Sequence, residues 1–269
     1  MVGASVRLVK AALTKLSPIL PYPRPMPSLT LDDRLIWFAH CPKAGGTSLE
    51  RAMVARWGAA VGHLHWGWDR WWRRGGWQVA DPPNSPQHLT WQDARAALPR
   101  APDAVFALVR EPAARMASEY RWQRRHRCGT RAGRWLAHLP FSVWLRVMLA
   151  TARINPHAFD NHIRSQTDFV PDGAVVFRLE DGLEAPLAWL AEITGTGLAG
   201  APPHELASGA AGRGLAAADL ARIGAAFEAD YARFGYARPA GPVPTRDGLD
   251  RLASVLAPLV AALDRRGAL

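Results

Sequence analysis

The sequence predicts a single α/β domain in which a central parallel sheet is flanked by helices on both faces. Three observations predict it. Short apolar runs alternate along the chain with segments of helical period, which is the pattern of a parallel sheet. The chain of 269 residues is long enough to bury one large core. Hydrophobic residues make up 49% of the chain and charged residues 21%, the balance of an ordinary globular protein.

Two strand–turn–helix units occupy the first half of the chain. In the first unit the apolar run 35–40 (LIWFAH) leads into a helix over 47–58, where Thr47 and Glu50 have the spacing of a capping box. In the second unit the apolar run 104–110 (AVFALVR) leads directly into another helical segment. Because the carboxyl ends of parallel strands meet at one edge of a sheet, we expect the residues that follow these two strands to lie together.

The second half of the chain continues the alternation, and proline-rich stretches connect its elements. We divide the chain into an N-terminal arm (1–30), a core domain (31–238) and a C-terminal helical extension (239–269). The elements expected in this half are a strand over 175–180 and helices over 141–152, 185–195, 219–236 and 251–263.

Composition narrows the class of partner. The formal net charge is +10, which favours an anionic partner. The densest arginine cluster, at 121–134, lacks zinc-finger spacing, an RNP-like aromatic motif and heptads, so we expect a solvated basic face and no nucleic acid partner. Two cysteines give no disulfide framework, and no apolar run reaches membrane-spanning length. These features indicate a cytoplasmic protein without a transmembrane segment.

The stretch AHCPKAGGTSLE (39–50) contains the parts of an anion-binding loop. Lys43 is one of only three lysines in the chain and stands before a glycine pair, whereas a Walker lysine follows its glycines. A glycine-bearing turn between a strand and a helix directs backbone N–H groups at one point, and Thr47 and Ser48 add hydroxyl donors. The glycines and Thr47 also suit an ordinary turn and cap, but the lone lysine favours anion binding.

The second candidate stretch is ALVREPAARMASEY (107–120). Arg110 ends an apolar strand, where its charge needs a partner, and arginine is the residue suited to bidentate phosphate recognition. Arg115 and Ser118 share a helix face because they are three residues apart. The alternatives are an ion-paired or surface arginine and an ordinary helix serine.

Together the two stretches resemble sulfotransferases that use 3′-phosphoadenosine 5′-phosphosulfate (PAPS), and among them the family-2 carbohydrate sulfotransferases, which include uronyl 2-O-sulfotransferases. The resemblance runs over 34–236 and implies a P-loop-like three-layer fold, PAPS as donor, adenosine 3′,5′-bisphosphate (PAP) as product, and no metal. The residues matched to the 5′-phosphosulfate loop are Pro42, Lys43, Gly45, Gly46, Thr47 and Ser48, and Ala44, which stands inside the loop, is expected to bind the donor with them. Those matched to the 3′-phosphate segment are Arg110, Pro112, Arg115, Ser118 and Tyr120, of which Arg110, Arg115 and Ser118 are expected to contact the donor.

The same resemblance implies a catalytic histidine. In uronyl 2-O-sulfotransferases it precedes the phosphate-binding arginine, and here the stretch QHLTW places His88 twenty-two residues before Arg110. An acceptor hydroxyl must lose a proton, and a histidine is a suitable general base near neutral pH. Lys43 is expected to stabilise the charge that develops as the nucleotide leaves. From the residues alone, His88 is equally a loop histidine before a helix capped by Thr90.

Two further stretches are candidates for the acceptor site. HWGWDRWWRRGGW (65–77) sets tryptophans beside arginines, which suits a stacking floor for a sugar, a lipid-facing lid at a membrane surface, or a helix that buries its tryptophans. NHIRSQ (161–166) is polar for a segment between helices, and the resemblance puts it near the donor or acceptor. The candidate residues are Trp71, Trp72, His162, Arg164 and Gln166.

The sequence therefore predicts a PAPS-dependent sulfotransferase whose acceptor is a hydroxyl of a glycan, a glycolipid or a smaller metabolite, anionic acceptors included. Two alternatives stay open. One is a nucleotide or metabolite kinase with an atypical phosphate loop, which the missing Walker lysine disfavours. The other is a basic nucleic-acid-binding protein, which the net charge permits.

Overall fold

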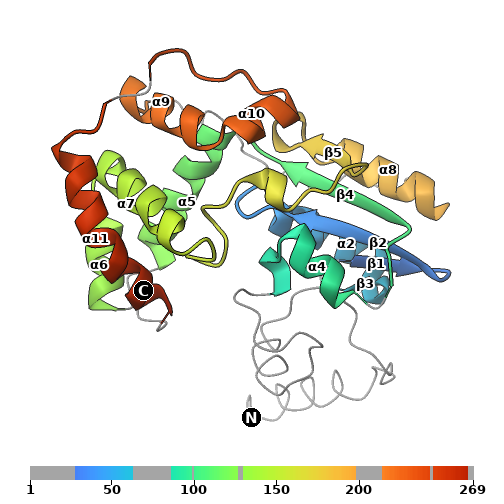
Figure 1. Cartoon of the computed structure of the whole chain (residues 1–269). Helices are drawn as coiled ribbons and strands as arrows, with labels where there is room; N and C mark the ends of the chain where they lie inside the picture. Colours follow the sequence, from blue (N-terminus) through green and yellow to red (C-terminus); the bar gives the residue numbers. More distant parts are fainter. Residues whose placement is uncertain are drawn as a thin grey trace, which may run out of the picture.

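The computed structural model describes residues 28–62, 86–98, 100–126, 130–197, 214–242 and 245–265, and it has the α/β architecture that the sequence predicts. Within these ranges the strands form one sheet in the order β3-β1-β2-β4-β5 (Figure 1). The strands are β1 (Ser28–Leu31), β2 (Arg34–His40), β3 (Val61–Gly62), β4 (Ala104–Val109) and β5 (Val175–Arg178).

The sheet is mixed rather than wholly parallel. β2, β4 and β5 are parallel, as expected, whereas β1 pairs antiparallel with both β2 and β3. Asp32 and Asp33 join β1 to β2 in a two-residue turn, both with positive φ (45° and 63°), a conformation that short polar side chains tolerate. The arm predicted to end at residue 30 therefore includes most of a sheet strand at its end, and its residues 1–27 lie outside the described ranges.

Two expectations about the helices differ from the structure, and the helix over Arg131–His138 is not among those expected. The stretch 219–236 forms two helices with a break at Phe227, whose φ of −118° and ψ of 30° are not helical. The expected capping box is wrong, because Gly45 is the N-cap of α2 in a left-handed conformation and no side chain of the described residues caps this helix. The helices described are α2 (Gly46–Trp57), α4 (Trp91–Ala97), α5 (Pro112–His126), α6 (Arg131–His138), α7 (Phe141–Ile154), α8 (Glu184–Thr194), α9 (Ala217–Ala226), α10 (Glu228–Phe234) and α11 (Gly248–Arg265).

Side chains from both faces of the sheet are buried under helices. Ile36 and Phe38 of β2 pack with residues of α2 and α8, whereas the alternate residues Trp37 and Ala39 pack with residues of α4 and α10. This alternation follows from the period of two along a strand. Both faces of β2 therefore carry apolar side chains, which explains the continuous apolar run.

A second core lies in the helical part of the chain, beside the sheet. Residues of α5, α6, α7, α9, α10 and α11 form one buried cluster, with Trp144 of α7 fully buried in it. Figure 1 shows α6, α7 and α11 grouped away from the strands. α11, which belongs to the predicted extension, contributes Ala253 and Val260 to this core. Within the described ranges, no helix combines the length and apolar character needed to cross a bilayer.

Candidate functional site

The site lies where the parallel strands β2 and β4 end at their carboxyl edge, the usual ligand edge of an α/β sheet. His40 is the last residue of β2, and a turn over 41–45 leads from it into α2. Arg110 directly follows β4. The edge therefore brings together the two stretches that the sequence singled out.

The glycine pair makes room for the protein's own side chains. A Cβ atom on Gly46 would lie 1.9 Å from Nε2 of His40, and one on Gly45 would lie 2.6 Å from Cδ1 of Leu179. Gly45 also has a φ of 86°, in the region that favours glycine. Packing against His40 and Leu179 thus explains both glycines. The N–H groups of Ser48 and Leu49 donate to the Gly45 carbonyl at 3.0 and 3.2 Å, whereas the N–H groups of Gly46 and Thr47 precede the first intrahelical acceptor, as at the start of every α-helix.

The other residues of the loop differ in exposure. Ala44 and Pro42 are buried, so their side chains belong to the core rather than to an open site. Ser48 is half-buried and Thr47 is exposed in the first turn of α2, which leaves these two hydroxyls nearest to solvent.

Lys43 is half-buried at this edge. Its φ of 65° is left-handed, a strained conformation for a side chain of this length. Nζ lies 5.1 Å from the centre of the Trp122 ring, and that ring lies 5.3 Å from the ring of His162. Burial lowers the pKa of Lys43, and the Glu119 carboxylate opposes this effect. The Trp122 ring therefore lies between the Lys43 ammonium group and the ring of His162.

His88 is held by contacts at its ring and at its backbone. Nδ1 lies 2.6 Å from Oδ2 of Asp160, and Nδ2 of Asn161 donates to the His88 carbonyl at 2.7 Å. Burial lowers the pKa of His88, with Asp160 acting in the opposite direction. Thr90 accepts from the N–H of Asp93 and is the N-cap of α4, which confirms the expectation that Thr90 caps a helix after His88.

The turn that presents Asp160 is strained. Phe159, Asp160 and Asn161 have φ values of 55°, 56° and 63°, three consecutive non-glycine residues in the left-handed region. The N–H of Phe159 donates to Oδ2 of Asp264 in α11 at 2.8 Å. Such strain persists only where surrounding contacts hold the backbone in place, and it is concentrated at functional sites.

A second carboxylate–histidine pair stands next to the first. Nδ1 of His162 lies 2.7 Å from Oε2 of Glu119, and the rings of His162 and His88 meet edge to face with their centres 4.7 Å apart. Glu119 is fully buried and accepts from Gln123 at 2.6 Å. Burial raises the pKa of Glu119, but His162 and the hydrogen bonds outweigh it and lower the pKa to about 2.

Arg110 lies between the two candidate stretches. Its Nη1 donates to the Lys43 carbonyl at 3.4 Å, while its buried Nε has no hydrogen-bond partner in the described part of the chain. Gln166 holds the Arg110 backbone, because its Oε1 accepts from the N–H at 2.9 Å and its Nε2 donates to the carbonyl at 2.8 Å. Gln166 is therefore buried and holds the Arg110 backbone in place, and it is not an exposed residue that could contact the acceptor substrate.

Arg115 is enclosed by protein. It is 0% exposed, and its Nη1 and Nη2 donate to the carbonyls of His162 and Arg164 at 3.1 and 2.6 Å. It therefore supports the segment that carries His162. Ser118 is half-buried on the same helix, and the Arg164 side chain is paired with Asp168 at 2.9 Å.

The structure brings Lys43, His88, Arg110 and His162 to one edge, and Trp71 and Trp72 lie outside the described residues. Sequence reasoning missed Asp160, Glu119, His40 and Trp122. For Asp160 a weak signal existed, since Asp and Asn are the residues that tolerate a left-handed turn.

A metal ion is a second kind of ligand for the histidines. Ligand atoms of His88, Asp160 and His162 lie within 4.8 Å of one another. A carboxylate at Nδ1 of each histidine is also the arrangement that orients metal ligands in other proteins.

Comparisons with family models, with curated proteins and with solved structures returned no match to this chain.

Proposed function

We propose that the protein is a sulfotransferase that transfers a sulfuryl group from PAPS to an acceptor hydroxyl. The observation that carries the proposal is a carboxylate-held histidine, His88 with Asp160, at the same sheet edge as Lys43 and Arg110. This combination offers a base and two cations at one edge of the sheet. The resemblance of the two stretches to PAPS-dependent enzymes, and with it a P-loop-like fold, adds to the argument.

The donor is expected to bind along the turn between β2 and α2. Lys43, the first N–H groups of α2 and the hydroxyls of Thr47 and Ser48 are the groups proposed for the 5′-phosphosulfate. Arg110, whose buried Nε–H has no partner among the described residues, is proposed for the 3′-phosphate, together with Ser118. Because Arg115 is enclosed, we assign it the role of positioning the segment of His162.

His88 is proposed as the general base and Asp160 as its positioning residue. A carboxylate only accepts, so Asp160 holds the proton on Nδ1 and makes Nε2 the basic position of the ring. The donor supplies an activated sulfuryl group. In the reaction an S–O bond forms to the acceptor oxygen, the S–O bond to the 5′-phosphate breaks, and the acceptor proton passes to His88.

The burial of His88 is compatible with a role as general base. Burial lowers the pKa of His88, so the imidazole is neutral and able to accept a proton at neutral pH. Lys43 is proposed to stabilise the negative charge that grows on the leaving nucleotide. His162 stands beside His88 and is proposed to contact the acceptor. The net charge of +10 favours a glycan, glycolipid or metabolite acceptor that is itself anionic.

A thermal-shift panel tests the proposal. PAP should raise the melting temperature, because a ligand that binds the native state alone stabilises it. ATP with Mg²⁺ and a mixed-sequence oligonucleotide should have no such effect at the same concentration. Stabilisation by ATP–Mg²⁺ without PAP would instead favour a kinase, and stabilisation by the oligonucleotide alone would favour nucleic acid binding.

A further inference from the structure

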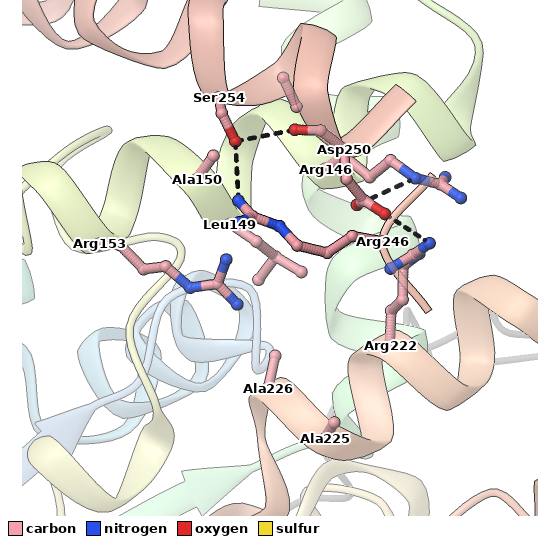
Figure 2. A pocket seen from close by; sticks show the side chains of 11 residues that line it. Arg146, Leu149, Ala150, Arg153, Arg222, Ala225, Ala226, Arg246, Asp250 and Ser254 are labelled. Atoms are coloured by element: carbon pink, nitrogen blue, oxygen red, sulfur yellow. Dashed lines mark hydrogen bonds and ion pairs between the residues drawn. The ribbon is translucent and has the colours of Figure 1, made fainter. Parts of the chain in front are cut away.

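A cavity of about 290 Å³ lies in the helical part of the molecule, between α7, α9 and α11 (Figure 2). None of its lining residues belongs to the candidate site described above. Four arginines line it: Arg146, Arg153, Arg222 and Arg246. So many like charges around one small space need negative charge nearby.

Two of the four arginines have their negative partners within the protein. Nη2 of Arg146 lies 3.1 Å from Oδ2 of Asp247, and Nη1 lies 3.4 Å from Oδ1 of Asp219. Nη2 of Arg222 lies 2.9 Å from Oδ2 of Asp250. These ion pairs connect α7, α9 and α11. They also offset the positive charges of the Arg146 and Arg222 guanidinium groups. Nε of Arg222 is nevertheless buried, and no described residue accepts a hydrogen bond from it.

The other two arginines have no carboxylate partner among the described residues. Arg246 donates to the hydroxyl of Ser254 at 3.2 Å, whereas the side chain of Arg153, in α7, makes no hydrogen bond or ion pair with the residues described. In Figure 2 the guanidinium groups of Arg153 and Arg246 extend from different elements into the same space. Two cations that face one cavity repel each other, and an anion between them would offset this repulsion.

The remaining lining is apolar. Leu149 and Ala150 of α7 and Ala225 and Ala226 of α9 form walls beside the guanidinium groups. Arg146 and Arg222 pair with three aspartates, Asp219, Asp247 and Asp250, so these aspartates and the four arginines together carry a formal charge of +1 before any ligand binds. A ligand that fits has a compact anionic head and a short carbon part. The volume is near the lower limit of small-molecule sites, about 300 Å³.

We propose that this cavity binds the phosphate or sulfate group of a small organic ester. The planar fork of arginine matches the oxygens of such a group bidentately, and Arg153 and Arg246 are the two forks available. Nε–H of Arg222 supplies a further donor at the cavity wall. The apolar walls accommodate the carbon part. This proposal is independent of the sulfotransferase proposal, because the two sites share no residue.

Calorimetric titration of the full chain with inorganic phosphate, at low ionic strength, tests the anion site. The double variant Arg153→Gln/Arg246→Gln should weaken the binding by at least about tenfold, because two charge-assisted partners are lost. Both side chains are exposed, so the fold should be retained. The matched control Arg251→Gln/Arg265→Gln removes the same charge from exposed positions of α11 that do not line the cavity, and it should bind like the wild type.

Arg110→Ala distinguishes phosphate binding at the sheet edge from phosphate binding at the cavity. It should leave the binding at the cavity unchanged. The proposal is overturned if both double variants bind phosphate equally, or if Arg110→Ala abolishes the binding and the cavity variant retains it. Glucose 6-phosphate and glucose then test the ester. The phosphate ester should bind at least as tightly as inorganic phosphate, and glucose should not bind. An ester that binds more weakly than inorganic phosphate contradicts the role given to the apolar walls.

Discussion

At the scale of single residues, the pair of His88 and Asp160 determines what chemistry the proposed site can perform. The carboxylate fixes the ring orientation and the position of the ring proton, while burial keeps the imidazole neutral. His162 has the same kind of partner in Glu119. The neighbouring His40 differs, because its Nδ1 is buried without a hydrogen-bond partner in the described part of the chain.

Asp160→Asn tests the positioning role. The amide can donate to Nδ1 and so favours the tautomer with the proton on Nε2. In the proposed reaction Nε2 must be free to take the proton of the substrate hydroxyl. We expect kcat to fall by about 10²–10⁴-fold with PAP affinity unchanged, as measured by steady-state kinetics and calorimetry. Asp172→Asn, the same change at an exposed carboxylate, is the control and should keep the wild-type rate. Parallel losses of kcat and PAP affinity in Asp160→Asn would mean a merely structural role.

His40 predicts a pH dependence of stability. Burial lowers its pKa well below the ordinary value of 6.5, and the nearby His88 lowers it further. Below about pH 6.5 the unfolded chain therefore binds a proton that the folded protein does not, so the free energy of unfolding falls as the pH falls. One such proton is worth about 1.4 kcal/mol per pH unit.

The pKa of His88 is lowered as well, so its contribution has the same sign. Urea unfolding at about pH 7.5 and 5.5 measures how far the free energy of unfolding falls between the two pH values. We expect this fall to be smaller by about 1 kcal/mol in His40→Gln than in the wild type. An equal loss in both proteins would mean that His40 does not carry this dependence.

At the scale of elements, the connection from β2 to α2 is shaped by packing as much as by ligand binding. The last strand residue, His40, occupies the space next to Gly46, and the turn between them includes Lys43 in a left-handed conformation. The position of the proposed phosphate-binding lysine therefore depends on a close contact between the end of the strand and the start of the helix.

Gly46→Ala tests this dependence. A Cβ at that position would lie 1.9 Å from Nε2 of His40, so the ring or the helix must move. We expect the free energy of unfolding to fall by about 1–3 kcal/mol, the cost of overpacking a core, in urea unfolding. Gly248→Ala is the control, because among the described residues its added Cβ meets no atom within 4 Å apart from those of its chain neighbours and its own helix backbone. Wild-type stability in Gly46→Ala would show that the contact is not tight in solution.

At the scale of the whole molecule, the sequence predicts the parallel part of the sheet and places the ends of β2 and β4 at one edge, because long apolar runs followed by helices are strong local signals. It does not predict β1, whose short strand is joined to β2 by only two residues. The contact of Asp160 with His88 is not predictable either, since it spans 72 residues and depends on a strained turn that α11 supports. The enclosed position of Arg115 depends on tertiary packing in the same way.

The measurement that tests the central claim most directly is calorimetric titration of the full chain with PAP. We expect one site per chain in the wild type, and a dissociation constant about 10- to 150-fold higher in Arg110→Ala, the effect of losing a charged hydrogen-bond partner of about 1.5–3 kcal/mol. His88→Ala should bind PAP like the wild type, because His88 is assigned to the acceptor hydroxyl. If the folded wild type binds no PAP, or if Arg110→Ala binds it as tightly as the wild type does, the account of the donor site is wrong.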